Sequence, residues 1–280
     1  MPRPFVEAVG RVLADGARDP AFAAEALVLP SEPYVAEQLE IVDPDAIHAA
    51  RNALRRSIAG ALRAELLAAY RSFEVTGRYS PDAQSAGCRA LRNMALGYLM
   101  ELGDPEIEAR CVAQFDGADN MSDRMAALGA LANSDATARA GALERFYAEW
   151  KREPLVVDKW LAVQATSRRA DTLDRVRALL SHEAFDLRNP NKVYALIRSF
   201  CANHVRFHAA DGAGYAFAAE RVIELDPLNP QIAARLARAF DRWRKFDAGR
   251  QAHARATLER IRSAPNLSKD VAEVVTKALA

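Results

Sequence analysis

Apolar residues recur along the chain at spacings of three and four positions, the pattern of one buried stripe on an α-helix. Two clear stripes follow Asn189 and Asn229; they contain Val193, Leu196, Ile197 and Phe200, and then Ile232, Leu236, Phe240 and Trp243. Segments 121–131, 143–150 and 173–180 show the same spacing. No segment sustains the period-two alternation of a half-buried strand. The pattern predicts an all-α fold.

Helix starts are marked by a polar residue directly before proline. Such pairs occur at Asp19-Pro20, Asp43-Pro44, Ser80-Pro81, Asp104-Pro105, Asn189-Pro190 and Asn229-Pro230. The polar side chain can accept hydrogen bonds from the free amides of the first turn, and proline loses only an N–H that has no partner there. Each pair therefore predicts a helix that begins at the proline.

The predicted starts are evenly spaced in the middle of the chain. They fall at Asp104, Asn120, Asp135, Pro154, Asp171 and Asn189, so that two helices take roughly 34 residues, the size of a helix–turn–helix repeat. Stacked antiparallel pairs of this kind form a solenoid. We expect one domain over residues 1–280, an irregular superhelical solenoid of HEAT/armadillo-like pairs over 76–280, and a helical lead-in over 1–75 with one long helix from Asp43 to Phe73.

Charge and composition exclude several classes of partner and location. The 38 basic and 37 acidic residues leave a net charge of +1, so no global field favours nucleic acid or an anionic membrane. The three widely spaced cysteines, Cys88, Cys111 and Cys201, are typical of reduced thiols. The start of the chain has no signal-peptide pattern, and no window is apolar enough to span a membrane. We expect a cytoplasmic protein.

One short stretch, CANHVRFHAADG at residues 201–212, contains metal-ligand residue types. His204 and His208 have the spacing of a zinc-binding pair, but Val205 stands where an H-E-x-x-H motif has its catalytic glutamate. Asp211-Gly212 is typical of a turn. The two interpretations are a metal site and a connection between two repeat helices; the missing glutamate and third ligand favour the connection, so we expect no metal in this chain.

A row of cations is the other candidate site. Arg235, Arg238 and Arg242 lie beside the apolar stripe of their predicted helix, and Lys192 and Arg198 flank Tyr194. Arginines on one side of a solenoid can hold a carboxylate or a carbonyl group of a peptide. The alternative is a solvated face on which the arginines pair with nearby Asp and Glu.

Several ordered segments resemble the C-terminal part of the bacterial aminopeptidase N family. They include CRALRNMALGYL, NMSDRMAALGAL, LVVDKWLAVQATS, NPNKVYALIRSF, FHAADGAGY, NPQIAARL and NLSKDVAEVVTKALA, and the likeness covers essentially the whole chain. Members of that family are zinc peptidases that remove single residues from peptide N-termini. They join a β-rich N-terminal domain, a thermolysin-like catalytic domain, a small β-domain and an α-helical C-terminal domain, which this chain resembles.

The resemblance implies a non-catalytic role for this chain. The family's zinc motif H-E-x-x-H and its G-x-M-E-N segment are both absent, so the resemblance places zinc in a catalytic domain elsewhere and implies no peptidase activity for these residues alone. It implies a domain that encloses the active-site cavity, contacts the catalytic and N-terminal domains, and limits access to short peptides. Arg235 matches an arginine that reaches toward the cavity in relatives, with Tyr194 and Lys192 beside it. The alternative is a free-standing helical-repeat scaffold for protein–protein interaction.

Overall fold

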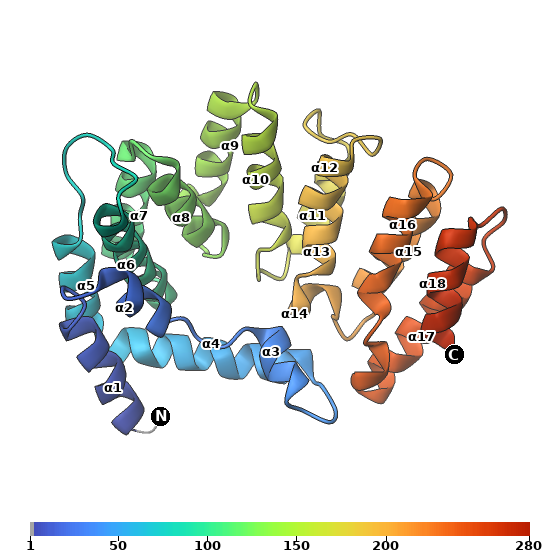
Figure 1. The fold of residues 1–280 in the computed structure, drawn as a ribbon, viewed down its shortest axis with the longest axis horizontal. Helices are drawn as coiled ribbons and strands as arrows, with labels where there is room; N and C mark the ends of the chain where they lie inside the picture. Colours follow the sequence, from blue (N-terminus) through green and yellow to red (C-terminus); the bar gives the residue numbers. More distant parts are fainter. Residues whose placement is uncertain (1–2) are drawn as a thin grey trace. The chain divides into compact units, whose positions relative to one another are not determined.

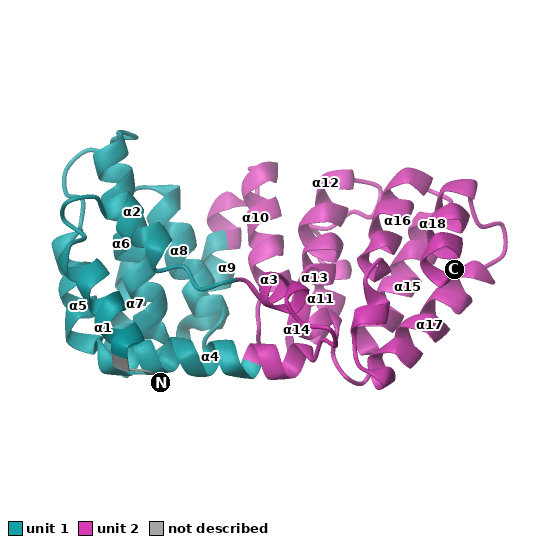
Figure 2. Ribbon diagram, turned by 60° about the horizontal axis from the view of Figure 1, so that its bottom comes forward, with its two compact units in different colours: residues 1–30, 49–146 teal, residues 31–48, 147–280 magenta. Residues whose placement is uncertain are grey.

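The computed structural model describes residues 3–280, and these residues form helices joined by turns and loops (Figure 1). Helices make up 72% of the chain and no strand is formed among the described residues, which confirms the all-α prediction. The chain divides into two compact units, shown in different colours in Figure 2: residues 1–30 with 49–146, and residues 31–48 with 147–280. The expected division into a lead-in over 1–75 and a solenoid over 76–280 stays a prediction.

Unit 1 contains the first and the middle helices. These are α1 (Arg3–Ala14), α2 (Pro20–Ala26), most of α4 (Pro44–Ala61), α5 (Arg63–Ser72), α6 (Ala83–Leu99), the 3₁₀ turn η1 (Met100–Leu102), α7 (Pro105–Gly117), α8 (Met121–Ala132) and most of α9 (Ala138–Trp150). Helix α6 is central, because α2, α5 and α8 all pack against it. Its buried residues Leu91, Leu96 and Leu99 are fully covered by these neighbours.

Unit 2 contains α3 and the helices after α9. These are α3 (Glu32–Glu37), α10 (Pro154–Ala165), α11 (Thr172–Leu180), α12 (Pro190–Val193), the π-helix η2 (Tyr194–Arg198), α13 (Ser199–Cys201), α14 (His204–Phe207), α15 (Ala213–Leu225), α16 (Pro230–Ala237), the 3₁₀ turns η3 (Arg238–Phe240) and η4 (Trp243–Lys245), α17 (Ala248–Arg262) and α18 (Lys269–Leu279). Phe200, Phe207 and Phe217 meet edge to face in its core.

The capping prediction is confirmed at most sites. The side chains of Asp19, Asp104, Asn189 and Asn229 each accept a hydrogen bond from a backbone amide of the following turn. Asp43 Oδ1 accepts from the amides of the next turn in the same way. Because the bond closes within one helical turn, the sequence indicates it directly at these five sites.

Three boundary predictions are wrong. The helix expected at Ser80-Pro81 begins at Ala83, because Asp82 accepts the capping bond from the Ser85 amide. The helix expected at Asp135 begins at Ala138, after a turn in which Ser134 Oγ accepts a bond from the Ala136 amide.

The long helix expected from Asp43 to Phe73 is also divided, into α4 and α5. The backbone leaves helical geometry at Leu62, with φ −119° and ψ 29°. Helix α5 packs against both α1 and α6. The bend lets buried Leu66 and Tyr70 of α5 face these partners, although the apolar stripe itself continues without a break.

Candidate functional site

Arg235 lies on α16 at the edge of the buried stripe, as the sequence predicted. Asn229 Oδ1 caps the helix by accepting from the Ile232 amide at 3.2 Å. Ile232 and Leu236 are buried on one side of α16, and Arg235 is exposed between them. The capped start and the apolar stripe therefore fix the direction of the Arg235 side chain.

Arg235 meets Tyr194, although 41 residues separate them. Its Nη1 donates to the phenolic oxygen of Tyr194 at 2.8 Å. The guanidinium of Arg198 lies over the Tyr194 ring, 5.5 Å from its centroid. Since the phenol accepts a bond from Arg235, its own proton remains able to donate, and the guanidinium keeps further N–H groups. The pair can therefore present several donors to one carbonyl or carboxylate group.

Tyr194 is held by an unusual turn. It begins the π-helix η2, and Ser199 Oγ, at the start of α13, donates to the Tyr194 carbonyl at 3.1 Å. The residues around it, Leu196 and Ile197, are fully buried. Single π-turns inside helices occur often at functional sites, because they redirect one side chain without ending the helix. The half-buried Tyr194 ring is thus fixed by the core beneath it.

Lys192 lies two residues before Tyr194 in the sequence, but its ammonium group is used in contacts that hold two helices together. Lys192 is buried, and its Nζ donates to Asp158 Oδ1 at 2.7 Å and to the Pro154 carbonyl at 3.0 Å. Both partners belong to α10, so the side chain fastens α12 to the first turns of that helix. Of its three N–H donors, two are used in these contacts. Its expected role beside Arg235 stays a prediction.

The two other arginines of the cationic row have acidic partners. Arg238 Nε lies 3.0 Å from Asp241 Oδ2, and Arg242 pairs with Glu37. For these two residues the contacts fit the solvated-face interpretation. Arg235, in contrast, donates a hydrogen bond to the phenol of Tyr194. It therefore differs from Arg238 and Arg242 in having a neutral partner.

The two histidines of the 201–212 stretch lie in the packed interior of unit 2. His204 begins α14 and His208 directly follows its last residue, with ring centroids 5.2 Å apart. His208 Nδ1 is 2.8 Å from the hydroxyl of Tyr215, and burial holds the pKa of His208 well below its usual value. Burial also lowers the pKa of His204, although Glu32 opposes that shift.

The family resemblance implies a zinc ion in a catalytic domain outside these residues, and the histidines of this chain do not form a zinc site of their own. The Nδ1 of His208 is occupied by Tyr215, and His204 Nδ1 lies 3.9 Å from its nearest carboxylate, Glu32. Across residues 3–280 no group of three or more His, Cys, Asp or Glu side chains is arranged to hold a metal ion.

Two of the three cysteines, Cys111 and Cys201, are also unsuited to nucleophilic catalysis. Burial raises the pKa of Cys111 to about 12 and that of Cys201 to about 12. A thiol nucleophile acts as its thiolate, which such surroundings suppress at neutral pH.

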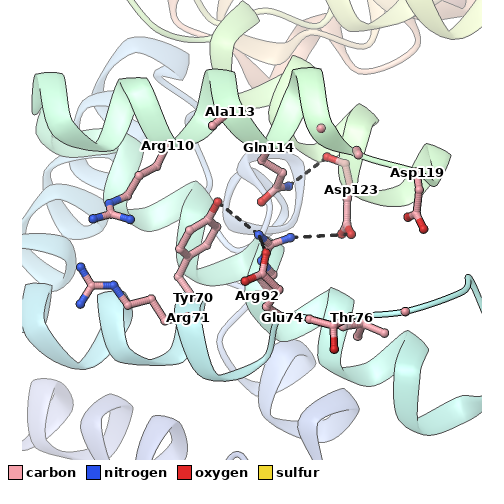
Figure 3. A pocket seen from close by; sticks show the side chains of 14 residues that line it. Tyr70, Arg71, Glu74, Thr76, Arg92, Arg110, Ala113, Gln114, Asp119 and Asp123 are labelled. Atoms are coloured by element: carbon pink, nitrogen blue, oxygen red, sulfur yellow. Dashed lines mark hydrogen bonds and ion pairs between the residues drawn. The ribbon is translucent and has the colours of Figure 1, made fainter.

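Unit 1 contains a cavity of about 550 Å³. The sequence did not indicate it as a candidate site. Its walls include Arg92, Gln114 and Asp123, three polar residues at little-exposed positions of their helices (Figure 3). The available signal was Asp123, a polar residue that is buried on α8. A polar residue at a buried helical position requires a partner, and the sequence does not say which.

Comparisons with known proteins agree with one another. The whole chain, residues 1–280, matches the family described as "Domain of unknown function (DUF3458_C) ARM repeats". It is 43% identical to aminopeptidase N of Caulobacter vibrioides and 40% identical to that of Escherichia coli, over 98% and 100% of this chain. The chain spans 32% of the length of each of these relatives.

A solved structure is similar over the whole chain. Aminopeptidase A of Legionella pneumophila, solved in complex with aspartic acid, superposes with a TM-score of 0.92 at 31% sequence identity. The match covers 100% of this chain and 34% of that protein. Within the described part of this chain, no helix has both the length and the apolar character needed to cross a membrane.

Proposed function

Because this chain belongs to the DUF3458_C family of ARM-repeat domains, we propose that it is the non-catalytic C-terminal domain of an aminopeptidase. The support is the full-length similarity to about a third of aminopeptidase N, which leaves room for other domains in the relatives. In this proposal a catalytic domain outside these residues supplies zinc and removes N-terminal residues from peptides. The helical domain encloses the active-site cavity, limits access to short peptides, and works in the cytoplasm.

The observation that carries a peptide-facing role is the hydrogen bond between Arg235 and Tyr194. It holds an exposed guanidinium beside a phenol whose proton can still donate. A carbonyl or the C-terminal carboxylate of a short peptide accepts from such donors, and charged hydrogen bonds of this kind are stronger than neutral ones. Lys192 adds positive charge nearby, although its ammonium is held by Asp158.

The test is Arg235→Ala in the polypeptide that contains this chain together with its catalytic domain. We expect kcat/KM for di- and tripeptides to fall by a factor equivalent to about 1.5–3 kcal/mol, the value of a lost charge-assisted hydrogen bond. The melting temperature is expected to change little, since an exposed arginine seldom contributes more than about 1 kcal/mol.

The matched control is Arg238→Ala, an exposed arginine that is paired with Asp241. We expect unchanged kinetics for this variant. A lower melting temperature with unaltered kcat/KM in Arg235→Ala would show that the residue contributes to stability and not to peptide binding.

A further inference from the structure

We propose that the cavity of unit 1 is a second binding site, which takes a short peptide with both termini free. The proposal does not depend on the function given to Arg235, because the two sites share no residue. The cavity lies among α5, α6, α7, α8 and the loop after α5, and its volume of about 550 Å³ is in the range of small-molecule sites.

The first observation is an unpartnered amide oxygen in the wall. Gln114 is 6% exposed, and its Oε1 is buried without a hydrogen-bond partner. Its Nε2 donates to Asn93 Oδ1 at 2.7 Å and to the Asp123 carbonyl at 3.0 Å. Both partners are acceptors, so the amide cannot be turned over without placing oxygen against oxygen. The free Oε1 points toward Tyr70 and Arg92 in Figure 3, and it requires an N–H donor.

The second observation is a donor that also lacks a partner. Arg92 Nε is buried and unpaired, although its terminal nitrogens contact Glu74 at 2.9 Å and Asp123 at 3.8 Å. The guanidinium lies over the Tyr70 ring, 4.7 Å from the centroid, and its Nη2 is 3.5 Å from the Tyr70 hydroxyl. A donor and an acceptor without partners, on two side chains that line the same cavity, match the carbonyl and the N–H of a peptide group.

The third observation is the arrangement of charged groups along the cavity, in which Arg92 and Glu74 pair with each other between two ends of opposite charge. In Figure 3 the guanidinium groups of Arg71 and Arg110 lie at one end, and the carboxylates of Asp119 and Asp123 lie at the other. Gln114 lies between the two ends. Asp123 is buried, and its oxygens accept bonds from Asn93 and Asn120. A ligand that fits this order has a carboxylate, then an amide, then an ammonium, which describes an unblocked short peptide.

The experiment is calorimetric titration of the 280-residue chain with trialanine. We expect one saturable site. Loss of one charge-assisted contact is expected to weaken binding about tenfold or more. We therefore expect that loss in Arg71→Ala and in Asp119→Asn, two exposed positions at which substitution leaves the packed core intact. N-acetyl-trialanine and trialanine amide are expected to bind more weakly by similar factors.

Matched controls are Arg56→Ala and Asp15→Asn, exposed residues of unit 1 that do not line the cavity. Both are expected to bind trialanine as the parent chain does. Arg235→Ala separates the two sites, because it belongs to the proposed function and not to this cavity.

Three results would overturn the proposal. They are the absence of saturable trialanine binding, equal binding of the blocked peptides, and binding that Arg235→Ala removes while Arg71→Ala and Asp119→Asn leave it intact. The last result would support the Arg235 site alone, so the two proposals fail separately.

Discussion

His208 shows how burial changes the chemistry of one residue. The ring lies among His204, Phe207, Tyr215 and Phe246, and its Nδ1 bonds to Tyr215. Burial is the main cause of its lowered pKa, and the nearby His204 and Arg250 add to it. The neutral ring is therefore the form that the folded chain accommodates.

The pH dependence of stability follows from that shift. In the unfolded chain a histidine titrates at about 6.5. Because the folded pKa is lower, the stabilisation is complete above the unfolded value and is lost as the pH falls from there toward the folded pKa. We expect the melting temperature of the chain to fall between pH 7 and pH 5.

The variant His208→Gln tests the assignment, since glutamine offers an acceptor to Tyr215 and does not titrate. We expect a smaller fall in melting temperature over the same pH range. His253→Gln, at an exposed position, is the control and should keep the slope of the parent chain. An unchanged slope in His208→Gln would rule out His208 as the cause.

At the scale of the element, the start of α15 depends on two glycines. Gly212 has φ +71°, in the left-handed region, and directly precedes the helix. Gly214 lies so close to α14 that a Cβ placed there would be 2.3 Å from the Phe207 carbonyl oxygen. The turn that the sequence indicated at Asp211-Gly212 is therefore also a close packing contact.

We expect Gly214→Ala to lower the free energy of unfolding by about 1–3 kcal/mol, the usual cost of forcing an extra group into a packed site. The control is Gly97→Ala in α6, where a Cβ meets nothing within 4 Å. That change should raise stability by about 0.5–1 kcal/mol, because alanine favours the helix. Urea denaturation of both variants measures the difference, and two changes of the same sign would contradict the packing argument.

At the scale of the whole molecule, each of the two units has its own core. Leu91 is fully buried in unit 1, and Leu258 is fully buried in unit 2. In repeat proteins stability is close to a sum of local terms, since each repeat contacts mainly its neighbours. A substitution that weakens one core should then destabilise its own unit before it affects the other unit.

Hydrogen exchange tests that locality. Leu91→Ala and Leu258→Ala each remove a buried side chain, at an expected cost of about 2–5 kcal/mol. We expect faster amide exchange in residues 49–146 for the first variant and in residues 147–280 for the second. Equal acceleration across the whole chain in both variants would instead indicate one cooperative unit.

The sequence by itself determined the all-α fold, most helix starts and the exposed edge position of Arg235. Each of these depends on contacts within one or two turns: a capping oxygen reaches an amide three residues later, as Asn229 does for Ile232. The side of the helix that is buried follows from the same short spacing. The bend at Leu62 lay outside this range, because α5 packs against other helices. The start at Ala83 is a local feature, but Ser80 and Asp82 are both possible caps, and the sequence pattern did not choose between them.

Only the tertiary structure decided which polar groups meet. Tyr194 reaches Arg235 across 41 residues, and Lys192 reaches Asp158 across 34. Asn93 meets Asp123 across 30, which places the wall of the unit 1 cavity. Helical periodicity shows which side of each helix is buried but not which helix covers it. The partner of a buried polar side chain, and hence the chemistry of both candidate sites, therefore depends on how the helices stack.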